Sequence, residues 1–114
     1  MFTYGVCLAS EVNTNDLVVP PRIEQELRAI PVQKVDFTIS NSTDHVISIK
    51  NYTVLCECTQ VATKDKTLLP HTTTEARAYI RRNEPYVASV FIQDDKEHWY
   101  RTDIVLTRKF SPPQ

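Results

Sequence analysis

VQKVDFTIS, residues 32–40, alternates apolar and polar side chains with a period of two. Val35, Phe37 and Ile39 share one face, and the residues between them are charged or polar. Successive side chains of a strand point to opposite faces, so this pattern is typical of a β-strand with one face on a core and one face in water. This segment is the clearest strand signal in the chain and predicts a sheet.

The residues that follow this strand predict consecutive antiparallel strands. NSTD at 41–44 has the composition of a turn, because Asn and Asp side chains bond their own backbone. The strand pattern resumes directly afterwards, so we expect an antiparallel hairpin of 33–40 with 45–50. A further strand is expected from 52 to 62.

Two segments near the C-terminus predict a second hairpin. YVASVFIQ at 86–93 and HWYRTDIVLTRKF at 98–110 flank DDKE, four polar residues that favour a hairpin loop. Apolar side chains occur on both faces of 86–93, which indicates a central strand covered on each side. Residues 2–9 also alternate and are expected to form a strand.

RIEQELRAI, residues 22–30, predicts a short helix. Ile23, Leu27 and Ile30 follow at spacings of four and three, which places them on one helical stripe. The prolines at 20–21 suit a first helical turn, where a missing N–H removes no hydrogen bond. Pro31 is expected to end this helix.

A second helix is predicted between His71 and Pro85. Thr72 and Glu75 have the spacing of a capping box, in which a hydroxyl and a carboxylate satisfy the free N–H groups of the first turn. The residues Ala76, Tyr79 and Ile80 then follow at helical spacing.

Together these segments predict an α+β fold: a single small domain over residues 1–110, with a short tail at 111–114. The domain would hold about six mostly antiparallel strands and two short helices. The alternative is a mainly-β sandwich or barrel in which the helices are peripheral.

Composition excludes several classes of function. The formal net charge of −1 gives no global attraction to nucleic acid or to an anionic membrane. Gly5 is the only glycine, so a glycine-rich phosphate loop or nucleophile elbow cannot be built. No apolar run approaches the ~20 residues of a membrane-spanning helix. An odd number of cysteines, three, and the absence of a basic secretory signal favour a reducing, cytoplasmic location.

The Cys-x-Cys pair at 56 and 58 is the one motif that suggests chemistry. In an extended strand both side chains point the same way, and we interpret Cys56 and Cys58 as small buried thiols. The weaker alternative is a metal site, and a small metal-dependent enzyme, formed by these two residues with Cys7 and a histidine: His45, His71 or His98. We expect no cofactor.

Cationic and aromatic residues predict a candidate binding surface. Three arginines and a tyrosine lie on the second predicted helix, and a tryptophan and an arginine lie on the last predicted strand. If that strand runs beside the helix, they form a basic strip with aromatic rings for stacking. The residues are Arg77, Tyr79, Arg81, Arg82, Trp99 and Arg101.

The function we predict is that of a non-catalytic protein-binding module. The chain shows no catalytic constellation or cofactor loop, and strands with exposed edges pair readily with other chains. We expect another protein as partner, a homo-oligomer, most simply a dimer, and a role as a viral or phage accessory or inhibitor protein. The alternative is a nucleic-acid or nucleotide binder that uses the arginines; no membrane contact is expected.

Overall fold

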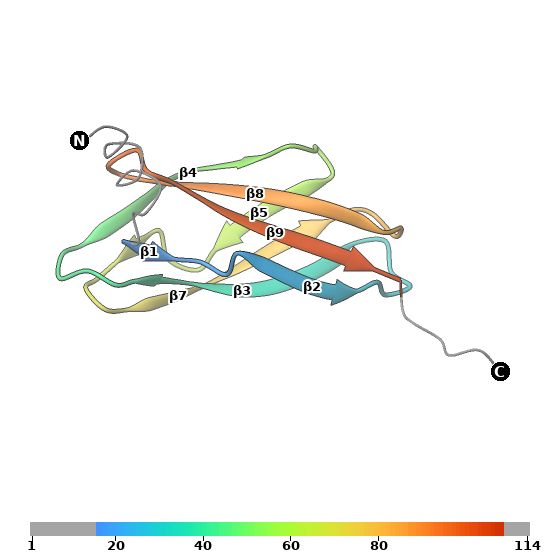
Figure 1. The fold of residues 1–114 in the computed structure, drawn as a ribbon, viewed down its shortest axis with the longest axis horizontal. Coiled ribbons are helices and arrows are strands. Elements are labelled where there is room, and N and C mark those ends of the chain that lie inside the picture. The colour runs from blue at the N-terminus through green and yellow to red at the C-terminus, as the bar shows by residue number, and fades with distance from the viewer. Residues whose placement is uncertain (1–15, 109–114) are drawn as a thin grey trace, which may run out of the picture.

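Two β-sheets packed face to face make up residues 16–108, the part of the chain that the computed structural model describes (Figure 1). The first sheet has the strand order β1-β3-β7-β5 and the second has the order β2-β9-β8-β4-β6. Strands β2 and β9 pair in parallel, and the other pairs are antiparallel. The bounds are β1 Leu17–Val18, β2 Arg22–Glu26, β3 Gln33–Asn41, β4 Ile47–Val54, β5 Thr59–Thr63, β6 Thr67–Leu68, β7 Thr73–Ile80, β8 Tyr86–Asp94 and β9 Trp99–Thr107.

The strand order is that of an immunoglobulin-like sandwich. The sheet β1-β3-β7-β5 and the run β9-β8-β4 have the arrangement of the two sheets of that fold. The first strand of the sandwich is divided: β1 pairs with β3 in one sheet, and β2 pairs with β9 in the other. Pro20 and Pro21 lie at the crossing, where the chain leaves one sheet for the other.

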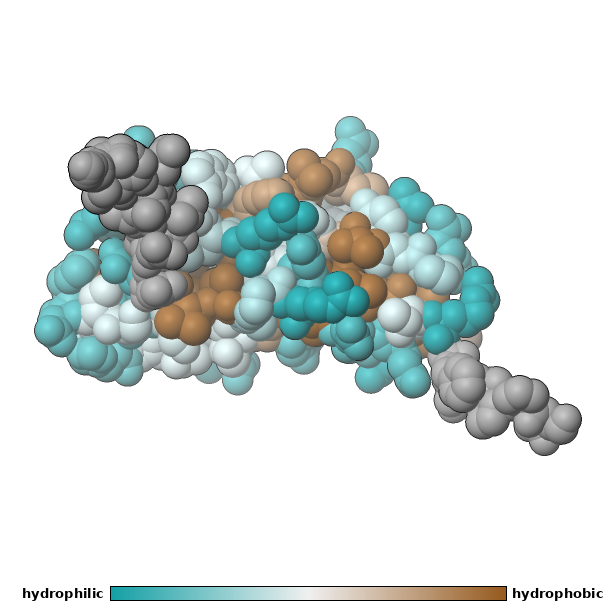
Figure 2. Space-filling view, in the orientation of Figure 1, coloured by the Kyte–Doolittle hydropathy of each residue, from teal (hydrophilic) through white to brown (hydrophobic). Residues whose placement is uncertain are grey.

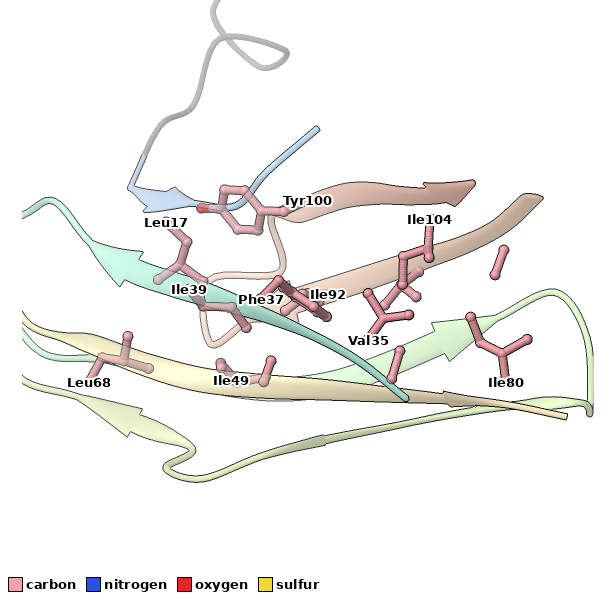
Figure 3. Packing of buried hydrophobic residues seen from close by; sticks show 14 of the residues in the cluster. Leu17, Val35, Phe37, Ile39, Ile49, Leu68, Ile80, Ile92, Tyr100 and Ile104 are labelled. Atoms are coloured by element: carbon pink, nitrogen blue, oxygen red, sulfur yellow. The ribbon is translucent and has the colours of Figure 1, made fainter. Parts of the chain in front are cut away.

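The core lies between the sheets and follows the two-residue period of the strands. The inward side chains of β3 are buried, as the alternation of residues 32–40 predicts, and the outward ones are exposed or partly exposed. Figure 3 shows these side chains meeting those of β8 and β9 in the layer between the sheets. The most deeply buried include Val35, Ile39, Ile80, Val90, Ile92, Ile104 and Leu106.

The expected α+β class is wrong, because residues 16–108 contain no helix. The alternative of a mainly-β sandwich or barrel is closer to the structure, although it also included peripheral helices. The mostly antiparallel pairing is confirmed. The strand expected at 2–9 lies outside the described residues. In residues 16–108 the chain has no helix with the length and apolar character needed to span a membrane.

The first predicted helix is instead β2 and the segment after it. Ile23 and Leu27 are four residues apart, an even number, so a strand places them on one face as readily as a helix does. Gln25 distinguishes the two: a helix would turn it away from Ile23, whereas the structure leaves it half-buried on the same face. Ile30, the third member of the predicted stripe, is exposed.

The second predicted helix is β7. Thr74, Ala76, Ala78 and Ile80 are all buried, and Glu75 and Arg77 between them are exposed. The apparent capping box was therefore wrong: Thr72 lies before the strand, and its hydroxyl donates to the carbonyl of Leu69 at 2.7 Å. Pairing of β7 with both β3 and β5 satisfies its backbone, which overrides the helical tendency of alanine.

The first predicted hairpin does not form. Strands β3 and β4 follow one another but belong to different sheets, so residues 42–46 cross between the sheets. The expected strand 52–62 is also interrupted, because β4 ends at Val54 and β5 begins at Thr59.

The second predicted hairpin is confirmed. β8 pairs with β9 from Tyr86↔Leu106 to Gln93↔Trp99, and residues 95–98 connect them. β8 is the middle strand of its sheet, as its apolar composition indicates. Its outer face is covered only in part, however, since Val87 on that face is 52% exposed.

Candidate functional site

An apolar patch lies on the outer face of the five-stranded sheet. We call it the outer-face patch and define it as Thr53, Leu55, Phe91 and Trp99, which line one shallow hollow. Strand alternation turns Phe91 outward between the buried Val90 and Ile92. Thr53 lies opposite Phe91 across β4 and β8, and Trp99 lies on β9 two residue pairs beyond the pair of Phe91 with Arg101.

The patch exposes large apolar side chains to solvent. Leu55 is 75% exposed and Trp99 is 51% exposed, and the hollow between them measures about 290 Å³. On the face seen in Figure 2, hydrophobic residues form small groups bordered by hydrophilic ones. Several large apolar side chains around one hollow are the type of feature that marks a contact surface.

A polar cluster borders the outer-face patch on the same sheet face. Arg101 donates from Nε to Asp103 at 2.9 Å, and Ser89 donates to the same carboxylate at 2.8 Å. The guanidinium of Arg101 also lies 5.5 Å from the ring centre of Phe91, which is within cation–π range. The hydrogen bond from Arg101 lowers the pKa of Asp103, although partial burial opposes this effect.

The lowered pKa of Asp103 predicts a measurable acid dependence of stability. A carboxyl whose folded pKa lies below its unfolded value stabilises the fold above the unfolded value, about pH 4, and loses that contribution as pH falls. Urea denaturation between about pH 6 and pH 2 should show a smaller loss of unfolding free energy in Asp103→Asn than in the wild type. If the unfolding free energies of the two proteins fell in parallel with pH, the lowered pKa of Asp103 would be contradicted.

The predicted binding residues are divided between the two outer faces of the sandwich. Arg77 and Tyr79 lie on the outer side of β7 in the four-stranded sheet, whereas Trp99 and Arg101 lie on the outer side of β9 in the five-stranded sheet. Arg77 is paired with Asp36, its cross-strand neighbour, and donates from Nη2 at 3.2 Å. This hydrogen bond lowers the pKa of Asp36.

Arg81 and Arg82 follow β7 and have partners of their own. Arg81 donates from Nη2 to the backbone carbonyl of Glu57 at 3.1 Å. Arg82 donates to Glu84 at 2.9 Å and stacks 4.2 Å from the ring centre of Tyr86. The six residues therefore do not form the single strip expected from a helix beside the last strand.

Sequence reasoning missed three members of the outer-face patch: Thr53, Leu55 and Phe91. The signal for Phe91 is present in the alternation of 86–93, which places it on the face opposite Val90 and Ile92. The position of Leu55 has no comparable signal. It depends on β4 ending one residue earlier and on the pairing of β4 with β8, a contact between distant parts of the chain.

The interpretation of Cys56 and Cys58 as buried thiols is wrong. Both lie in the turn between β4 and β5, both are partly exposed, and their sulfurs form a disulfide. Bonded sulfurs are not the thiolates that zinc requires. Cys7, the third member of the metal alternative, lies outside the described residues.

A cluster of Asp16, Asp94 and His98 has side-chain ligand atoms within 4.8 Å of one another. Asp94 already accepts hydrogen bonds at both oxygens: Oδ1 from the backbone N–H groups of Lys96 and His98, and Oδ2 from the hydroxyl of Tyr100. These bonds shape the β8–β9 hairpin, so we assign Asp94 a structural role.

The fold resembles several solved structures. A protein of unknown function from Porphyromonas gingivalis has a TM-score of 0.70 at 10% identity, over 79% of this chain and 45% of that one. The VesB protease of Vibrio cholerae has a TM-score of 0.65 at 13% identity, over 90% of this chain and 35% of the protease. A xyloglucanase of Bacteroides ovatus, solved with a heptasaccharide, has a TM-score of 0.53 at 9% identity, over 86% of this chain and 20% of the enzyme.

The sequence itself matches no family model and no curated protein. The similarity to these structures, at 9–13% identity, concerns the fold alone. The chain spans less than half the length of each of them, so the matched region is one part of a longer chain in every case.

Proposed function

We propose that the chain is a non-catalytic protein-binding module, that the outer-face patch is its contact surface, and that a second copy of the chain is a partner. The observation that carries this proposal is the exposure of Trp99 and Leu55 beside Phe91 on the outer face of the sheet. Tryptophan is among the residues that contribute most binding energy at protein interfaces, particularly at the centre of a contact.

The rigidity of the sheet supports a role in association. Trp99 and Phe91 project from β9 and β8, whose backbones pair over eight consecutive residue pairs. Side chains fixed on a paired sheet lose little conformational entropy on binding, which favours affinity for a given area. Arg101 beside Phe91 adds a cation to the rim of the apolar surface.

The charges near the patch favour a second copy as the partner. In a two-fold contact both subunits present the same residues, so the surface must complement itself. Opposite charges lie close together here: Arg101 pairs with Asp103, and Lys50 lies 3.6 Å from Glu97, two residues before Trp99. A two-fold axis through the patch would let a cation of one copy face a carboxylate of the other.

The nucleic-acid alternative has weaker support. Arg77, Arg82 and Arg101 are each paired with a carboxylate of this chain, which reduces their attraction for phosphate. Phosphate binding by the arginines therefore remains a prediction from the sequence.

Within residues 16–108, each histidine contacts a charged side chain. His45 lies 3.3 Å from the ammonium of Lys96, His71 lies 2.6 Å from Asp44, and His98 lies beside Asp94. A catalytic triad also needs a nucleophile beside the histidine, and none of these three contacts supplies one. The cytoplasmic location and the viral or phage accessory role remain predictions from the sequence.

Light scattering across a concentration series tests the proposal. We expect the wild-type mass to rise from 13.1 kDa toward twice that value with concentration. Trp99→Ala should weaken the association by about 30-fold, because loss of an aromatic anchor removes ~2 kcal/mol. Leu69→Ala, which removes another exposed apolar side chain, should leave the association unchanged. A wild-type mass that stays monomeric at all concentrations, or equal weakening by both variants, would refute the proposed dimer.

A further inference from the structure

The turn between β4 and β5 holds a disulfide between residues two positions apart. Cys56 and Cys58 are bonded, with a Cα–Cα distance of 5.1 Å, and only Glu57 lies between them. The flanking Leu55 and the intervening Glu57 are exposed, and both cysteines are partly exposed. The bond is therefore accessible to a small reagent from solvent.

Hydrogen bonds hold this turn in shape independently of the disulfide. The N–H of Thr59 donates to the carbonyl of Cys56 at 3.1 Å, and the N–H of Arg81 donates to the carbonyl of Cys58 at 2.7 Å. The guanidinium of Arg81 also donates to the carbonyl of Glu57 at 3.1 Å. Three contacts to successive carbonyls would keep the two sulfurs adjacent after the bond is broken.

The position of the disulfide argues against a role as a structural staple. A disulfide stabilises mainly by closing a loop of the unfolded chain, and the effect grows with loop length. The loop here spans three residues, so its closure restricts the unfolded chain very little. The two cysteines also lie outside the buried cluster between the sheets.

We propose that Cys56 and Cys58 form a reversible dithiol–disulfide site that exchanges with low-molecular-weight thiols of the glutathione class. An incoming thiolate attacks Sγ of Cys58, the Cys56–Cys58 bond breaks, and Cys56 leaves as a thiolate. A second thiol then attacks the mixed disulfide and releases Cys58. Two small thiols are oxidised to one small disulfide. Their two electrons and two protons reduce the protein disulfide to two thiols.

The hydrogen bonding of the turn determines which sulfur leaves first. The backbone N–H of Cys58 donates to Sγ of Cys56 at 3.1 Å. A hydrogen bond to the charged form of a group favours that form, so this donor stabilises the Cys56 thiolate. A stabilised thiolate is the better leaving group. In the opposite direction the same steps run backwards: Cys58 attacks a small disulfide, and the Cys56 thiolate then attacks Sγ of Cys58 to close the ring.

Redox equilibration of a Cys7→Ser chain tests the site without interference from the third cysteine. The protein is incubated with mixtures of reduced and oxidised glutathione, free thiols are alkylated, and the mass is measured. We expect a reversible transition between a species with two alkyl groups and one with none. Circular dichroism should show the same β-sheet signal for both. Two alkylated thiols under fully oxidised glutathione, or loss of the sheet signal on reduction, would overturn the proposal.

Single-cysteine chains test the assignment of roles. Cys7→Ser/Cys58→Ser retains only Cys56, and Cys7→Ser/Cys56→Ser retains only Cys58. With Ellman's reagent at neutral pH, the chain with Cys56 should react several-fold faster, because its thiolate fraction is larger. Equal rates, or a faster reaction of Cys58, would overturn the assignment. Both thiol assays are run at a concentration where light scattering finds the monomer, so their outcome does not depend on the proposed dimer.

Discussion

Replacing Asp94 by alanine should lower the unfolding free energy by about 3 kcal/mol, because it leaves a buried hydroxyl and two partly buried N–H groups without an acceptor. The carboxylate is 1% exposed and accepts from the backbone N–H groups of Lys96 and His98 at 2.9 and 2.8 Å. Its other oxygen accepts from the buried hydroxyl of Tyr100 at 2.9 Å. Burial raises the pKa of Tyr100, and this hydrogen bond raises it further.

Asp95→Ala is the matched control for this prediction. Asp95 is exposed and accepts one long hydrogen bond, from the backbone of Ser48 at 3.2 Å. Its loss should change the unfolding free energy by less than about 1 kcal/mol in urea denaturation.

A double-mutant cycle with Tyr100→Phe separates the hydroxyl contact from the backbone contacts. The loss of unfolding free energy in the double variant should be about 1 kcal/mol smaller than the sum of the losses in the two single variants. The reason is that each single variant already removes the hydrogen bond between Tyr100 and Asp94. Additive losses, or a small effect of Asp94→Ala, would refute the assigned role.

Replacing Asn41 by alanine should have a similar effect, of about 3 kcal/mol, because its buried amide connects three segments of the chain. The side chain is 1% exposed, and Nδ2 lies within hydrogen-bond distance of the carbonyls of His45, Leu68 and Leu69, at 2.8 to 3.1 Å. Oδ1 accepts from the backbone N–H and the hydroxyl of Thr43. These contacts fix the crossing from β3 to β4.

Asn41→Asp gives a sharper test of the same contact. It keeps the shape but replaces the donor by a second acceptor, which would face the same carbonyls, so it should destabilise at least as strongly as alanine. Asn51→Ala is the control, because Asn51 is exposed and bonds only the side chain of Gln93 among the contacts described. A loss for Asn41→Ala no larger than for Asn51→Ala would contradict the role of the amide in the crossing.

Local alternation predicted β3, and the short polar segment at 94–97 predicted the confirmed β8–β9 hairpin. The two false helices share one cause. Ile23 and Leu27, like Ala76 and Ile80, are four residues apart, a spacing that fits both a helix and a strand. Only the residue midway between them distinguishes a strand from a helix, because it shares their face in a strand and not in a helix. In β7 that residue is Ala78, whose small apolar side chain fits both a buried strand face and a helix.

The site was less predictable than the strands because it depends on contacts between distant segments. Trp99 and Arg101 were identified from residue type alone, but their separation from Arg77 follows from which sheet each strand joins. The β3–β4 connection has the composition of a hairpin turn, yet it crosses between sheets. Partner choice is determined by the whole core, and no local pattern encodes it.

The parallel pairing of β2 with β9 has a mechanical consequence. The two strands run in the same direction, from Arg22↔Asp103 to Glu26↔Thr107. A force applied before Arg22 and after Thr107 would pull them past one another lengthwise and load all of the hydrogen bonds between them together. Shearing a row of bonds at once is harder than opening them in sequence, so this pairing would act as a clamp when the chain is under tension, and the barrier to unfolding would set how long it holds.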